Sequence, residues 1–177
     1  PRGAVPLHGP GRRCPHHKVA RPRSARSARP GHYHRFRCHD GPDRHRYLRL
    51  GSAAACNGEN VVIIRFLKGM RNDGFLKRLE PEIKIFRFEK SEEEFSQLSA
   101  ERQQEEIHNI KNGLNFAKKV LTTGECSLLI LDEVLGLIDN GIISVEDLQR
   151  IVEAKADDVG IIMTGIHLED QVCELAD

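Results

Sequence analysis

Three short, mostly apolar runs place the tightest constraint on how this chain can fold. They cover residues 61–66, 128–131 and 159–163, and β-branched residues are frequent in them. A strand that is apolar at nearly every position has both of its faces covered, as happens when helices pack on the two sides of a parallel sheet. We therefore expect an α/β fold in which these runs lie in the interior of the sheet.

Helical periodicity fills the segments between these runs. Residues 53–56, before Asn57-Gly58, are typical of the end of a helix, and residues 81–88 alternate as a less buried strand. The other expected helices are a long one over 100–121 that Gly124 ends, a short one at 134–138, and one that Ser144 and Asp147 begin with a capping box. Strands alternating with helices predict a parallel sheet whose ligands bind beyond the carboxyl ends of the strands.

The first 50 residues differ in composition from the rest. They hold 13 Lys and Arg against 2 Asp and Glu, whereas the remaining residues hold 14 against 24. They also contain seven of the nine His and no Glu, Gln, Ile or Met, so they lack the apolar content of a core. We therefore expect a disordered or out-of-frame basic segment at 1–50 and an incomplete α/β nucleotide-binding domain at 51–177.

Three interpretations of residues 1–50 follow from this composition. A genuine basic segment would attract polyanions such as nucleic acid, and an Arg- and Ser-rich leader is also typical of transit peptides. The third interpretation is a misread frame. Shifting the codons of residues 31–41 by one base permits Gly-Ile-Ile-Ile-Val-Ser-Val-Val-Thr-Thr, which resembles a strand that enters a Gly-rich phosphate loop. We favour the misread frame, because the rest of the chain lacks such a loop.

Cysteine usage and hydropathy limit the class of protein. The five cysteines show no C-x-x-C spacing and leave an odd count, which argues against a disulfide framework and for a reducing, cytoplasmic setting. No apolar run approaches the ~18 residues that a membrane span needs. We therefore expect a cytoplasmic protein with no membrane partner.

Two carboxylates directly follow the most apolar run. Asp132 and Glu133 come after residues 128–131, where a buried sheet presents side chains at its carboxyl edge. This is the Walker B arrangement, in which the Asp orients a metal ion through water and the next acid polarises a nucleophile or holds the metal shell. We therefore predict both as catalytic and metal-binding residues. The alternative is that they only cap the helix expected at 134–138.

The other two apolar runs also end in residues that suit a ligand. A cation at such a position can meet phosphate, and a glycine permits close approach. The alternatives are a solvated lysine with a turn glycine after the first run, and a plain turn after the last. We predict cofactor contacts for the residues at both ends, which are Arg65, Phe66, Lys68, Gly69, Thr164 and Gly165.

Several other polar residues are not expected to form a site. His108 and His167 are isolated and ordinary, and Cys126 and Cys173 are expected to be small buried residues. A charge-rich stretch is expected to be a solvated helix face; its members are Glu92, Glu93, Glu94, Glu101, Glu105 and Glu106.

The three strand ends, taken in order, resemble a known family. Residues 57–69, 128–133 and 161–165, with their spacing, resemble the bacterial ATP:corrinoid adenosyltransferases, and the strand that ends in Phe-x-Lys-Gly is the most distinctive piece. The resemblance covers roughly Gly51 to Asp177. It implies a three-layer, RecA-like P-loop NTPase fold with a mostly parallel sheet, commonly in a homodimer.

The same resemblance implies a reaction and its ligands. These enzymes transfer the 5′-deoxyadenosyl group of ATP to a Co(I) corrinoid in cobalamin biosynthesis or salvage and release the triphosphate, with Mg²⁺ or Mn²⁺ beside the nucleotide. Asp132 and Glu133 would then serve the metal. Lys68 and Gly69 would line the nucleotide or corrinoid side.

Two departures from the family pattern leave other functions open. The Gly-rich loop with its lysine and Ser/Thr is missing from the printed residues, and the family usually continues past the position of Asp177. The alternatives are an inactive form, another P-loop NTPase or ATP-binding regulatory protein, and a nucleic-acid binder. We expect nucleic acid as a partner only if residues 1–50 are genuine.

Overall fold

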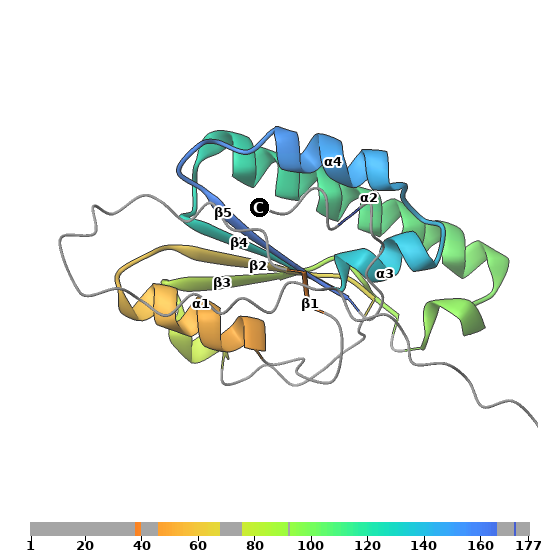
Figure 1. Ribbon diagram of the computed structural model, residues 1–177. Helices are drawn as coiled ribbons and strands as arrows, with labels where there is room; N and C mark the ends of the chain where they lie inside the picture. Colours follow the sequence, from red (N-terminus) through yellow and green to blue (C-terminus); the bar gives the residue numbers. More distant parts are fainter. Residues whose placement is uncertain (1–37, 40–45, 68–75, 92, 166–171, 173–177) are drawn as a thin grey trace, which may run out of the picture. The chain divides into compact units, whose positions relative to one another are not determined.

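A five-stranded parallel sheet forms the centre of the structure, in the order β1-β5-β4-β2-β3 (Figure 1). The structure is a computed structural model, and it describes residues 38–39, 46–67, 76–91, 93–165 and 172. The chain divides into two units, Pro1–Pro30 and Gly31–Asp177, of which the first lies outside the described residues. The strands are β1 (Cys38–His39), β2 (Val61–Arg65), β3 (Ile83–Arg87), β4 (Leu128–Asp132) and β5 (Gly160–Thr164).

Helices cover both faces of this sheet. Helix α1 lies on one face, and α2, α3 and α4 lie on the other (Figure 1). Their bounds are Arg46–Cys56, Ala100–Thr123, Val134–Asp139 and Val145–Glu153, with short 3₁₀ helices at Leu76–Leu79 and Phe95–Gln97. The predicted three-layer α/β fold of the RecA-like type is therefore confirmed. Within the described part of the chain, no helix is both long and apolar enough to cross a membrane.

The alternation of side chains along the strands explains why both faces are covered. In β2, Val62 and Ile64 pack into the core that faces α2, α3 and α4, whereas Val61 and Ile63 pack into the core on the α1 side. Every residue of β4 and β5 is buried. The prediction that the apolar runs are interior strands is therefore confirmed.

Helix ends follow the expected local chemistry. Gly124 ends α2 in the left-handed conformation, with φ of 65°, which a residue with a side chain rarely adopts. At the start of α4, the Ser144 hydroxyl accepts the Asp147 N–H and the Asp147 carboxylate accepts the Ser144 N–H, which is the predicted capping box.

The structure differs from the expected boundary after residue 50. Helix α1 begins at Arg46, so the boundary lies inside a helix, and Leu48 and Leu50 pack against the α1-side core. Cys38–His39 also forms a strand beside β5. The composition averaged over residues 1–50 does not reveal a short apolar stripe such as the one in α1. The remainder of the basic segment lies outside the described residues.

Gly113 allows α2 to lie close to the sheet. A Cβ atom at this position would lie 2.7 Å from Phe88 Cγ and 2.9 Å from Phe66 Cε1. We expect Gly113→Ala to lower the free energy of unfolding by about 1–3 kcal/mol, because overpacking outweighs the better helix propensity of alanine. Urea denaturation measures this change. Asn115→Ala, at an exposed position of the same helix, is the control and should be neutral or slightly stabilising; equal stabilisation by both changes would contradict the tight contact.

Candidate functional site

Four polar residues lie in a row where the parallel strands end. Arg65, the last residue of β2, is in register with Arg87 of β3 and with Asp132 of β4. Thr164 is the last residue of β5, which is the neighbour of β4. We call Arg87, Arg65, Asp132 and Thr164 the carboxyl row. It lies where ligands bind in open parallel sheets.

Asp132 is held by its two neighbours in the carboxyl row. Arg65 Nε donates to Asp132 Oδ2 at 3.0 Å, and Thr164 Oγ1 donates to Asp132 Oδ1 at 2.8 Å. The Asp132 side chain is 0% exposed and that of Arg65 is 11% exposed. Burial of a carboxylate is tolerated only when a cation and hydrogen bonds compensate for lost water. The network therefore fixes Asp132 and, in turn, the position of the Arg65 guanidinium.

Two residues beside the carboxyl row have a backbone conformation that side chains disfavour. Glu133, which follows β4, has φ of 62°, and Leu67, close after β2, has φ of 51°. The left-handed conformation costs roughly 1–2 kcal/mol in such residues, and strain of this kind gathers at functional sites. Glu133 donates its N–H to Thr164 Oγ1 at 3.0 Å, and its side chain does not cap α3. A side-chain capping hydrogen bond to α3 therefore does not account for the conformation of Glu133.

Arg87 brings a second positive charge to the carboxyl row. Burial, and then the nearby charge of Arg65, lower the pKa of the Arg87 guanidinium from its usual value. Two neighbouring guanidinium groups favour an anionic ligand over a cationic one. Arg87 was not among the predicted site residues. Its position became recognisable only once β3 was known to pair with β2 in register.

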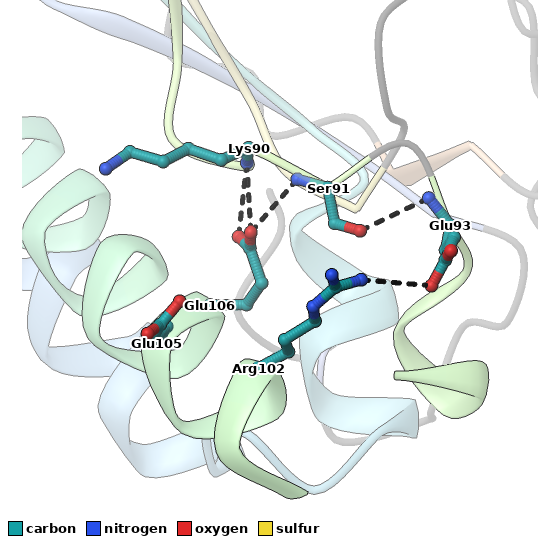
Figure 2. Close-up of a pocket in the computed structure, with 6 residues that line it drawn as sticks. All are labelled: Lys90, Ser91, Glu93, Arg102, Glu105 and Glu106. Atoms are coloured by element: carbon teal, nitrogen blue, oxygen red, sulfur yellow. Dashed lines mark hydrogen bonds and ion pairs between the residues drawn. The ribbon is translucent and has the colours of Figure 1, made fainter. Parts of the chain in front are cut away.

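A second polar site lies between the loop after β3 and the first turns of α2. A cavity of about 320 Å³ is lined by Lys90, Ser91, Glu93, Arg102, Glu105 and Glu106 (Figure 2). Both carboxylate oxygens of Glu106 accept the Lys90 N–H at 3.2 Å, and Oε1 also accepts the Ser91 N–H at 3.0 Å. Glu106 thereby ties the loop to the helix.

The expectation of a solvated face is wrong for Glu106. This residue is 6% exposed, whereas its neighbour Glu105 is exposed. Glu106 lies four residues before Ile110, which is fully buried, so it continues the apolar stripe of α2. That spacing was the available signal, and the surrounding acidic residues obscured it.

Comparison with known proteins identifies the family of this chain. Residues 48–177 match the family model of the ATP:corrinoid adenosyltransferases, described as BtuR/CobO/CobP. This chain belongs to that family. An uncharacterized protein of Nostoc sp. (strain PCC 7120) is 28% identical over 144 residues, which make up 75% of this chain and 36% of that protein. The chain thus spans about a third of the length of that relative.

The structure brings together some of the residues that were predicted for an adenosyltransferase site. Arg65, Asp132, Glu133 and Thr164 are linked through the hydrogen bonds described above. The Phe66 side chain, in contrast, is 0% exposed and belongs to the core on the α2 side. Lys68 and Gly69 lie outside the described residues. The cofactor contacts predicted for Lys68 and Gly69 therefore stay predictions.

Gly165 has a packing role in this family member. A Cβ atom at Gly165 would lie 2.4 Å from the Cβ atom of Leu135. The end of β5 can therefore lie this close to α3 only because residue 165 has no side chain. Leu135 is itself buried. The glycine therefore sets the spacing between the end of β5 and the start of α3. The predicted contact of Gly165 with a cofactor is a separate matter and stays a prediction.

The fit of Mg²⁺ or Mn²⁺ to the carboxyl row can be judged from the donor atoms. Magnesium is usually held by one or two carboxylates together with water and substrate phosphates. Asp132 is a poor direct ligand in this conformation, because it is fully buried and each oxygen accepts a hydrogen bond from Arg65 or Thr164. Among the described residues, no three His, Cys, Asp or Glu side chains gather as a metal site. Metal binding by Asp132 and Glu133 stays a prediction.

Cysteine chemistry is not part of the described site. Burial, as the main cause, raises the pKa of the Cys126 thiol to about 12. Cys126 therefore stays protonated at neutral pH and behaves as the small buried residue that was predicted. Cys173 and His167 lie outside the described residues, and His108 is exposed.

We expect Glu106→Gln to lower the free energy of unfolding by about 1–3 kcal/mol, because the amide offers one acceptor oxygen where the carboxylate offers two and turns a donor toward backbone N–H groups. Hydrogen exchange of the Lys90 and Ser91 amides should become faster. Glu105→Gln, the same change at the exposed neighbour, is the control. Unchanged exchange in Glu106→Gln would show that the loop is held by other contacts.

Proposed function

We propose that this protein transfers the 5′-deoxyadenosyl group of ATP to a Co(I) corrinoid. The observation that carries the proposal is the family match over residues 48–177. The carboxyl row supports it, because Arg65 and Arg87 suit a polyphosphate and lie at the edge of the sheet where such ligands bind. ATP and the corrinoid are both substrates in this proposal.

In the proposed reaction, the cobalt atom of the reduced substrate attacks C5′ of ATP. The electron pair of Co(I) forms the cobalt–carbon bond, the C5′–O bond breaks, and its electrons leave with triphosphate. The protein contributes orientation and neutralisation of the leaving group's negative charge. Arg65 and Arg87 supply positive charge, and Asp132 holds Arg65 in place. A divalent metal, when bound with ATP, would supply further charge neutralisation, for which Glu133 is the better-placed carboxylate.

The missing phosphate loop belongs to the same proposal. Residues 40–45 stand between β1 and α1 in the sequence, and a phosphate loop likewise stands between a strand and a helix. The sequence printed there, DGPDRH, has one glycine and no lysine. We propose that the chain is read out of frame before α1. The shifted codons of residues 31–41 predict a strand that enters a Gly-rich loop, and β1 at Cys38–His39 lies within the same stretch of sequence.

The test compares two forms of the protein. One has the present sequence, and the other is translated in the shifted reading frame before α1. Each is mixed with ATP, Mg²⁺ and a chemically reduced corrinoid, and formation of the cobalt–carbon product is followed by absorbance. We expect the restored form to turn over and the printed chain to be much slower. Absence of product from both forms would contradict the proposal. Phosphate release without corrinoid would instead favour another P-loop NTPase.

A further inference from the structure

We infer that Glu106 is a positioning residue for the corrinoid substrate. It fixes the backbone of residues 88–91, which follow β3, and these residues form a wall of the site on the corrinoid side. The identity of the substrate rests on the proposed function. The positioning role rests on the hydrogen bonds, burial and packing of this segment.

Helix α2 holds the segment 88–91 at both of its ends. The Glu106 carboxylate accepts the N–H of Lys90 on both oxygens and the N–H of Ser91 on Oε1 (Figure 2). Gly113, about two helical turns further along α2, lies against the ring of Phe88. A Cβ atom at Gly113 would lie 2.7 Å from Phe88 Cγ. The backbone of the segment is therefore fixed by a polar contact at one end and by close packing at the other.

A buried carboxylate is an unusual way to hold a loop. Glu106 is 6% exposed and lies on the buried side of α2 with Ile110. Burial of a charged group lowers stability unless hydrogen bonds compensate, and an apolar side chain of similar size often serves stability equally well. An apolar side chain, however, cannot fix the direction of two backbone N–H groups. Glu106 therefore serves the geometry of the segment more than the stability of the core.

The segment lies where a ligand is expected. It continues directly from Arg87, the last residue of β3, beyond the carboxyl end of the strand. Two cavities of about 320 and 570 Å³ lie beside it, and Lys90 and Glu106 line both of them. Sites for small molecules commonly have volumes of about 300–1,000 Å³. A segment that is fixed at this place can form one wall of such a site.

The strand order separates the two substrates. Among the described strands, β1 and β3 are the outer ones of the sheet. In the proposed function a phosphate loop follows β1 in the sequence, so the triphosphate of ATP belongs at that end. The segment after β3 lies at the other end and is left for the corrinoid. The amide groups on the rim of a corrinoid can exchange hydrogen bonds with polar side chains of the larger cavity, such as Gln104 and Asn109.

Binding measurements on the full chain test this inference without turnover. Equilibrium dialysis with hydroxocobalamin, read by its absorbance, gives the affinity for a corrinoid, and titration calorimetry gives the affinity for ATP with Mg²⁺. We expect Glu106→Gln to weaken hydroxocobalamin binding about threefold to tenfold, because a loosened segment must be ordered again when the ligand binds. The affinity for ATP should not change.

Two control variants accompany Glu106→Gln. Glu101→Gln makes the same charge change at an exposed position of α2 and should leave both affinities unchanged. Ile151→Val removes a buried methyl group from α4, away from the segment, and controls for a general loss of stability. It should also leave both affinities unchanged.

Three results would overturn the inference: a parent chain that does not bind hydroxocobalamin, unchanged hydroxocobalamin affinity in Glu106→Gln, or equal weakening of ATP and hydroxocobalamin binding in that variant. If Glu106→Gln does not fold, as judged by circular dichroism, Gly113→Ala decides by the same comparison, because it displaces Phe88 at the other end of the segment. A parent that binds hydroxocobalamin but forms no cobalt–carbon product would contradict the proposed function and leave this inference standing.

Discussion

Asp132→Ala is expected to lower the free energy of unfolding by about 3–5 kcal/mol, the range found when one partner of a buried ion pair is removed. The substitution takes away the carboxylate that receives Arg65 Nε and the Thr164 hydroxyl. The positive charge of Arg65 would stay in a site where 11% of its side chain is exposed. Urea denaturation at pH 7 measures the loss.

A double variant provides the control for this prediction. Asp132→Ala combined with Arg65→Met removes both charges and should be less destabilised than Asp132→Ala alone, because the buried cation is gone. If the single variant loses less than about 1 kcal/mol, Arg65 is stabilised mainly by other groups and the pair is not the anchor of the row.

Glu133→Gln is expected to lower kcat for adenosyl transfer by about 100-fold, in the range for removal of a charged catalytic group, with little change in stability. Glu133 is 7% exposed and holds a left-handed backbone, with φ of 62°, at a position where glycine would be relaxed. Rates at saturating ATP and corrinoid, in the form of the chain that turns over, measure the effect. A Gln variant that keeps half of the parent kcat would show that the carboxylate charge is not needed.

Two further variants separate the backbone of Glu133 from its side chain. Glu133→Gly should be as stable as the parent or more stable, because the strain is relieved, and it should be as inactive as Glu133→Gln. Asp157→Asn removes a carboxylate at an exposed position before β5 and should leave both kcat and stability unchanged. Equal losses in all three variants would point to a general effect of charge.

Most strands and helices could be predicted from the sequence because each depends on a pattern within a few residues. The apolar runs, the left-handed Gly124 and the Ser144 capping box are local features of this kind. The ends of β2, β4 and β5 could also be assigned to the carboxyl edge, since all parallel strands run the same way. This was enough to name Arg65, Asp132, Glu133 and Thr164 as candidates.

Pairing between distant segments could not be predicted in the same way. Arg65 and Asp132 are separated by 67 positions, and nothing local shows that their strands are neighbours in register. The position of Arg87 beside Arg65 likewise depends on the pairing of β3 with β2, which the local sequence does not show. Glu106 was missed for another reason, because its helical spacing from Ile110 competed with a strongly acidic surrounding sequence. The direct contact between Arg65 and Asp132 is therefore a finding of the structure that the sequence did not predict.

The short length of β1 has a consequence for the edge of the sheet. It pairs only Cys38 with Met163 and His39 with Thr164, so within the described residues no strand lies beside the first part of β5 on that side. Every residue of β5 is nevertheless buried, so this side of the strand does not offer an exposed template on which other chains could add strands and aggregate.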